Sequence, residues 1–176
     1  MTVDTIGALK GAALVDFTGT LSGYTQLPRF SQDFVSLVRG GLSSHSLVIV
    51  DRGVWMEEAE PLVVSDHLNL TGSNPLVGPN HPSGERFPVV QGVYLTDCLK
   101  GVKQGIAAGL KEGVVPGPED IALVRSFGAR CCCYNLVPSM LIAAHAGLKV
   151  LGLVLPEGRQ LSAQTIDAIN TLTGGK

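Results

Sequence analysis

Short apolar runs, each bounded by turn residues, constrain the fold of this chain more than any other feature of its sequence. They are four to seven residues long and rich in valine, leucine and isoleucine. Runs of this length and composition are typical of strands buried on both faces of a sheet. We therefore expect strands at residues 12–15, 47–50, 61–64, 129–134 and 149–155.

Amphipathic segments alternate with these runs. Apolar side chains recur near helical spacing at residues 29–39, 93–110, 138–145 and 162–172, which predicts four helices, the last with Ser162 as its N-cap. Strands that alternate with helices predict an α/β fold, with a mixed β-sheet flanked by helices. At 176 residues, the chain is expected to form a single domain over residues 1–176.

Composition excludes several classes of protein. Hydrophobic residues make up 45% and charged residues 16%, too apolar and too weakly charged for a disordered chain. The net charge of −2 and the lack of a basic stripe argue against binding of nucleic acid. No apolar run approaches the ~20 residues of a membrane span, and residues 1–5 lack the start of a signal peptide.

The cysteines and histidines predict neither a metal site nor a cofactor. Cys131, Cys132 and Cys133 are consecutive in an apolar run, so neighbouring side chains point to opposite faces and cannot form a cage together. With Cys98, they are expected to be buried thiols in a reducing cytoplasm. The four histidines are scattered without metal-ligand spacing.

One stretch breaks the alternation of strands and helices. Residues 65–88 read SDHLNLTGSNPLVGPNHPSGERFP, which predicts a loop of 24 residues dense in Asn, Gly and Pro. Loops of this length are uncommon in compact domains and are usually functional or packed on a partner. His67 and Asn69 are expected to satisfy backbone groups of this loop.

The loop resembles the signature loop of the trimeric purine nucleoside phosphorylase family, which reads close to DHINLTG-x-NPLxGPND and then RFP. Asp66-His-Leu-Asn-Leu-Thr-Gly-Ser-Asn-Pro-Leu-Val-Gly-Pro-Asn80 is a near match, and Arg86-Phe-Pro88 follows. A second resemblance covers residues 127–158, where Gly128-Ala129, Val137-Pro138 and His145 agree with the family. The resemblance extends over about residues 9–158. It implies a shortened phosphorylase fold, a homotrimer, and cleavage of purine nucleosides by phosphate.

The residues that the family uses to bind phosphate are not matched. Its Gly-Ser phosphate loop has no counterpart in this sequence. Its Arg-x-His element aligns with residues 16–24, where Phe17 and Gly19 replace the two cationic side chains and Asp16 would repel an anion. Its TNAAGG turn aligns with residues 50–54, which makes Arg52 a candidate cation for this area. The alternative is that Arg52 is a surface residue paired with Asp51 or a nearby Glu.

The purine and ribose positions are also changed. With deletions allowed, Glu119 aligns with the family's purine-binding Glu, whereas a rigid alignment puts Val114-Val115 there. The favoured interpretation of Gly-Pro-Glu-Asp is an ordinary helix start. The ribose-facing Met-Ser pair becomes Tyr134-Asn135, and the Asn that would meet purine N7 becomes Gly158. Glu119, Tyr134, Asn135 and Arg52 are therefore the candidate substrate-binding residues, and no catalytic residue is assigned.

Two functions of different class follow from this pattern. The first is a member of the family that has lost phosphorolysis and acts as a binding or scaffold protein, with a purine nucleoside or base as the candidate ligand. The second is an enzyme with a rebuilt site, either an active phosphorylase or a hydrolase of an N-glycoside. A hydrolase would need a carboxylate from Asp16, Asp51 or Glu119.

Overall fold

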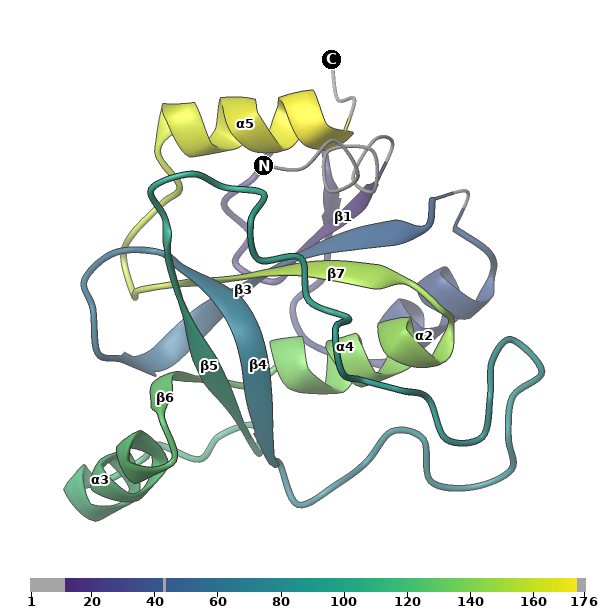
Figure 1. Cartoon of the computed structure of the whole chain (residues 1–176), viewed down its shortest axis with the longest axis horizontal. Helices are drawn as coiled ribbons and strands as arrows, with labels where there is room; N and C mark the ends of the chain where they lie inside the picture. Colours follow the sequence, from purple (N-terminus) through teal and green to yellow (C-terminus); the bar gives the residue numbers. More distant parts are fainter. Residues whose placement is uncertain (1–11, 43, 174–176) are drawn as a thin grey trace.

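A seven-stranded mixed sheet organises the chain in the computed structural model, which describes residues 12–42 and 44–173 (Figure 1). Its strand order is β2-β1-β3-β6-β5-β4-β7, and β7 also pairs with β3, so five of the strands close into a ring. The strands are β1 (Ala13–Asp16), β2 (Thr25–Gln26), β3 (Ser46–Met56), β4 (Leu62–Leu70), β5 (Lys103–Leu110), β6 (Ala129–Cys133) and β7 (Lys149–Leu155).

The long strand β3 joins the two parts of this sheet. Its first half pairs in parallel with β1 on one edge and β7 on the other, placing Leu47 opposite Ala13 and Val150. Its second half pairs antiparallel with β6, with a register shift between Gly53 and Trp55. β4, β5 and β6 then run parallel to one another, so their carboxyl ends meet at one edge.

The described helices are α2 (Gln32–Arg39), α3 (Pro118–Ser126), α4 (Leu136–His145) and α5 (Ala163–Thr173). α4 packs on β3, β4, β5 and β7, with α2 against it, and every residue of α4 is buried. α5 and the segment before β5 cover a second apolar cluster, built on Val48, Val63 and Leu151 (Figure 1). The predicted α/β class, a mixed sheet flanked by helices, is confirmed.

The helix expected at residues 93–110 is wrong. Residues 103–110 form β5, which pairs with β4 and β6, and the chain before it is irregular. Apolar residues here matched helical spacing, but tertiary pairing prevails over that local pattern. Gly109 is needed in the strand because a Cβ there would lie 2.6 Å from Val137 of α4.

The loop expected at residues 65–88 is shorter than predicted. β4 continues to Leu70, so the first six residues of the stretch are strand. Asn69 then holds the turn that follows: its side-chain oxygen accepts hydrogen bonds from the Thr71 N–H (3.2 Å) and hydroxyl (2.6 Å), and its amide donates to the Ser73 carbonyl. The expectation that Asn69 satisfies backbone groups is confirmed. The same expectation for His67 is wrong, because His67 lies in β4 and its buried Nδ1 has no hydrogen-bond partner.

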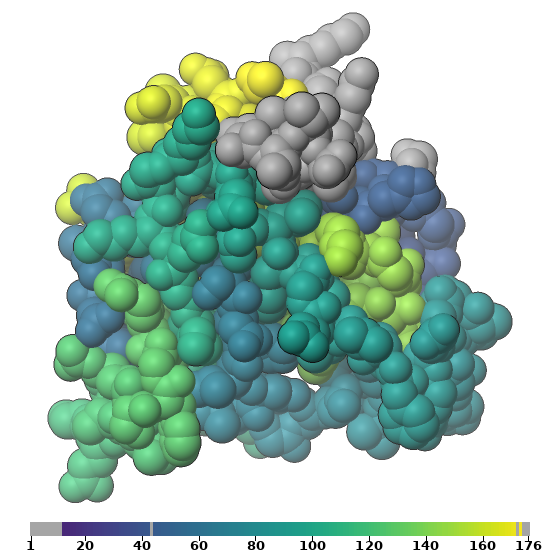
Figure 2. All heavy atoms as spheres, viewed as in Figure 1, coloured from purple at the N-terminus to yellow at the C-terminus, as the bar shows by residue number. Residues whose placement is uncertain are grey.

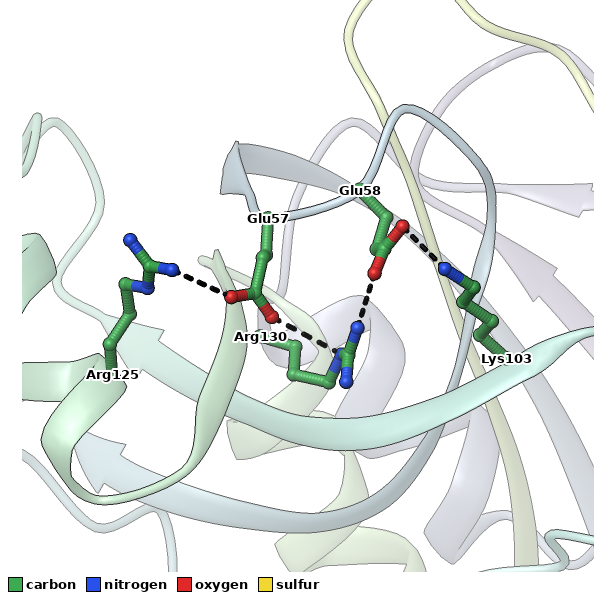
Figure 3. Close-up of polar contacts among 5 residues, drawn as sticks. All are labelled: Glu57, Glu58, Lys103, Arg125 and Arg130. Carbon is green, nitrogen blue, oxygen red and sulfur yellow. Dashed lines mark hydrogen bonds and ion pairs between the residues drawn. The ribbon is translucent and has the colours of Figure 1, made fainter.

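Five alternating charges hold α3 against the sheet (Figure 3). Glu57 binds Arg125 of α3 at 2.9 Å and Arg130 of β6 at 3.4 Å, while Glu58 binds Arg130 and, at 2.6 Å, Lys103 of β5. The hydrogen bond from Lys103, supported by the charge of Arg130, holds the pKa of Glu58 below its ordinary value. Among the described residues, no helix has the length and apolar character needed to cross a membrane.

Candidate functional site

A pocket of about 220 Å3 lies where β4, β5 and β6 end. In α/β folds, both open sheets and closed barrels bind ligands at the carboxyl ends of their parallel strands, so its position is that of a candidate binding site. β4 is followed by the 71–75 turn, β5 by Lys111 and Glu112, and β6 by Tyr134 and Asn135. The pocket is lined by Phe30, Thr71, Ser73, Asn74, Pro75, Leu110, Lys111, Glu112, Tyr134, Asn135 and Pro138.

Two of the four candidate residues, Tyr134 and Asn135, lie together in this pocket. Both have polar atoms already bound within the protein. The Tyr134 hydroxyl donates to the Val114 carbonyl at 2.9 Å. The Asn135 side chain donates to Asp51 at 2.9 Å and accepts the Phe30 N–H at 2.8 Å. A ligand would have to compete with these bonds for either side chain.

Asp51 is a buried carboxylate at the start of α4. It accepts the backbone N–H groups of Asn135 and Leu136, both at 2.8 Å, and of Arg52 at 2.9 Å. The N–H groups of Asn135 and Leu136 belong to the N-terminus of α4, which favours negative charge. Burial nevertheless raises the pKa of Asp51 above its ordinary value, against the opposing effect of its hydrogen bonds.

A second carboxylate fills the turn after β1. Asp16 is fully buried and lies opposite Val50 in the sheet, one residue before Asp51. Its two oxygens accept the backbone N–H groups of Thr18 (2.8 Å), Thr20 (2.9 Å) and Leu21 (2.8 Å). Converging N–H groups of this kind form an anion site. Here the anion is the chain's own carboxylate.

The other two candidates lie outside the pocket. Glu119 is exposed in the first turn of α3, which begins at Pro118, so the helix-start interpretation of Gly-Pro-Glu-Asp is confirmed. Arg52 donates to the carbonyls of Pro156 (3.1 Å) and Arg159 (3.3 Å). No acidic side chain among residues 12–42 and 44–173 pairs with it, so the expected acid partner is replaced by the β7–α5 loop. Ligand binding by Glu119 and Arg52 stays a prediction.

Sequence reasoning missed the carboxylate that does line the pocket. Glu112 directly follows the end of β5 and pairs with Arg29 at 3.4 Å. The signal that could have found it is the end of a strand at Leu110, but residues 93–110 were expected to be helix. Placed as a strand, they put Glu112 at the same edge as Tyr134.

Metal and redox chemistry have no visible centre in the described residues. No group of three or more His, Cys, Asp or Glu could hold a metal among them. All four cysteines are free and buried. Burial raises the pKa of the Cys132 thiol to about 11, so at neutral pH the reactive thiolate is scarce.

Comparison with known proteins gives consistent relatives, although no family model matches the chain. It is 31% identical over 163 residues to purine nucleoside phosphorylase 1 of Geobacillus stearothermophilus, covering 84% of this chain and 60% of the relative. It is 34% identical over 170 residues to purine nucleoside phosphorylase of Rattus norvegicus, covering 85% and 59%. The chain therefore spans about three-fifths of the length of these curated relatives.

Solved structures share the fold. A Schistosoma purine nucleoside phosphorylase in complex with guanosine aligns with a TM-score of 0.72 at 17% identity, covering 99% of this chain and 97% of that chain. The Schistosoma enzyme in complex with hypoxanthine aligns with a TM-score of 0.70. At this identity, the likeness shows the architecture alone.

Proposed function

We propose that this chain, which belongs to the purine nucleoside phosphorylase family, has lost phosphorolysis or retains it only very weakly, and acts as a binding or scaffold protein. Family membership alone does not carry catalysis, because function lies in the site and not in the fold. The observation that carries the proposal is the occupation of two N–H clusters by the chain's own carboxylates.

Phosphorolysis needs a site for a phosphate dianion. The segments that align with the family's phosphate elements contain Asp16 and Asp51. Asp16 occupies the N–H groups of the turn after β1, and Asp51 those at the start of α4. Phosphate would have to displace a buried carboxyl group from the N–H groups of either cluster. Neither cluster is therefore free to bind the nucleophile.

The residues that would bind the purine base are also changed. Gly158 has no side-chain amide to donate to the leaving base, and removal of one preorganised donor costs on the order of 10²–10³ in rate. The pocket volume of about 220 Å3 is also below the roughly 300 Å3 at which pockets for small molecules begin. A whole nucleoside would not fit without movement of its walls.

One observation favours the alternative of a rebuilt enzyme. Glu112 lies in the same pocket as Tyr134 and Asn135, so a carboxylate is available to activate water or to stabilise a positively charged sugar. This would make the chain a hydrolase of a nucleoside or another N-glycoside. Turnover in the absence of phosphate would distinguish it from a phosphorylase.

Calorimetric titration with inosine, guanosine and hypoxanthine, with and without phosphate, followed by an assay of base release, tests the proposal. We expect no turnover with or without phosphate. Base release that requires phosphate would overturn the loss of phosphorolysis, and release without phosphate would establish the hydrolase. If a purine binds, Glu112→Gln should weaken it and the matched variant Glu119→Gln should not, which decides between the two carboxylates.

The oligomer forms a second part of the proposal, a homotrimer in the cytoplasm. The loop after β4 exposes apolar side chains, with Val77, Phe87 and Val89 between 74% and 83% exposed, and forms a lobe at the lower right of Figures 1 and 2. Exposed apolar groups of this kind are typical of subunit contacts. Free buried cysteines fit a reducing compartment.

Light scattering tests the trimer. We expect a particle of three times 18.4 kDa, and a smaller one after Phe87→Ser. Val115→Ser is the matched control, because Val115 is equally exposed at 79% but lies just before α3, outside the segment that follows β4. A monomeric wild-type protein would contradict the homotrimer.

A further inference from the structure

A second cavity, of about 780 Å3, lies between the segment before β5 and the start of α5. In Figure 2 that segment, in teal, reaches the surface beside α5, in yellow. The cavity shares no lining residue with the pocket at Tyr134. Its walls are Glu60, Pro61, Cys98, Leu99, Lys100, Gly101, Val102, Lys103, Arg159, Gln160, Ser162, Gln164, Thr165 and Ala168.

The charge of this cavity is opposite to that of the whole chain. Three cations, Lys100, Lys103 and Arg159, line it against a single acid, Glu60, in a protein of net charge −2. Lys103 is already bound to Glu58 at 2.6 Å. No acid within the described part of the chain pairs with the side chains of Lys100 and Arg159. Two unpaired cations, Lys100 and Arg159, and one unpaired acid, Glu60, therefore remain in the described wall of the cavity.

The rest of the lining combines polar and apolar groups. Gln160 and Gln164 supply side-chain amides, while Leu99, Val102 and Ala168 supply apolar surface. The N-terminal turn of α5 contains no acidic residue. The first N–H groups of a helix have no partner within the helix. In α5, the Thr165 N–H donates instead to the hydroxyl of Ser162, at 3.1 Å. Both the cations and the helix end favour an anion.

We propose that this cavity binds a sugar phosphate. The phosphate would match the charges of Lys100 and Arg159, because a phosphate monoester carries close to two negative charges at neutral pH. The volume lies well within the roughly 300–1,000 Å3 of small-molecule sites, so it has room for more than the anion. The amides of Gln160 and Gln164 suit sugar hydroxyls, and the apolar wall suits the face of a sugar ring.

Calorimetric titration of the full chain with glucose 6-phosphate tests this site. Glucose alone and inorganic phosphate alone are the two comparison ligands. We expect saturable binding of glucose 6-phosphate that weakens as salt is added, and weaker binding of either part. The double variant Lys100→Gln, Arg159→Gln should bind about tenfold or more weakly, because two charge-assisted contacts are lost.

The matched control is the double variant Arg29→Gln, Lys111→Gln, which removes the same charge near the first pocket. All four side chains belong to exposed residues, and circular dichroism should show that both variants keep the wild-type fold. The control should bind as wild type does. The proposal is overturned by no binding, by equal binding of inorganic phosphate or glucose, by full affinity in the first variant, or by loss of affinity in the control. Because the two cavities share no lining residue, none of these results decides whether the chain has lost phosphorolysis.

Discussion

The carboxylate of Asp51 holds Asn135 at two points, the backbone N–H at 2.8 Å and the side-chain amide at 2.9 Å. The remaining polar atom of that side chain accepts the Phe30 N–H. Strand β3, the start of α4 and the segment before α2 are thus joined through one amide. Asn135 lines the pocket, but its polar atoms serve the fold.

Asp51→Asn should lower the free energy of unfolding by about 2–4 kcal/mol, because an amide group would then face N–H donors in a buried site. Urea denaturation measures the change. Asp33→Asn is the control: Asp33 is exposed on α2, and its loss should change stability by less than about 1 kcal/mol. Equal effects of the two variants would contradict the structural role given to Asp51.

Tyr134→Phe removes the hydrogen bond to the Val114 carbonyl, which ties the loop before α3 to the end of β6. We expect a loss of about 0.5–1.5 kcal/mol in stability. Amide hydrogen exchange should become faster at residues 111–117 and stay unchanged in α5. Unchanged exchange in the loop would show that this bond does not hold it.

Gly72→Val should destabilise the turn after β4. Gly72 has φ of +70°, and no atom lies within 4 Å of the position of a Cβ there, so the cost arises from the backbone alone. A β-branched residue in this conformation costs at least roughly 1–2 kcal/mol. Gly72→Asn should cost less, because Asn tolerates the left-handed region. Thermal denaturation that ranks Val and Asn equally would rule out this explanation.

Mild acid should destabilise the protein through His67. Burial lowers the pKa of His67 below its ordinary 6.5, and the buried Nδ1 has no hydrogen-bond partner. The unfolded chain therefore takes up a proton first, so stability present above pH 6.5 is lost as pH falls through the lower, folded pKa. Burial lowers the pKa of His145 in the same direction.

Urea midpoints at neutral and mildly acidic pH measure this loss. His67→Phe keeps a ring against Tyr94, whose centroid lies 5.9 Å away, and removes the titrating group. The variant should lose less stability between the two pH values than wild type does. If the variant showed the same pH dependence as wild type, the loss of stability in mild acid would not arise from His67.

Much of the fold could be predicted from the sequence because a buried strand appears there as a short apolar run. The apolar runs at 47–50 and 149–155 became the paired centre of the sheet, and the helix expected at 138–145 lies within α4. Residues 93–110 could not be placed correctly. Their partners in β4 and β6 are distant in sequence, and a short apolar pattern does not reveal such pairing.

The candidate site was predictable only in part, for a related reason. Tyr134 is the last residue of the run at 129–134 that predicts a strand, and Asn135 follows it, so their place at the end of β6 could be predicted. Glu112 follows β5, which the sequence pattern predicts as part of a helix, so Glu119 is the candidate carboxylate and Glu112 is not. The carboxylates of Asp16 and Asp51 were visible in the sequence, but their hydrogen-bond partners depend on the folded turns around them.

The double pairing of β3 has a consequence for how the chain reaches this structure. β7 closes the ring by lying between β3 and β4, with Lys149 opposite Ser46 and Leu153 opposite Val63. During synthesis, the ring cannot close until β7 has left the ribosome. Folding that depends on such distant pairs is slow, and both partner edges stay open to other strands in the meantime. Protection of these two edges from aggregation thus depends on β7, the strand that completes the ring.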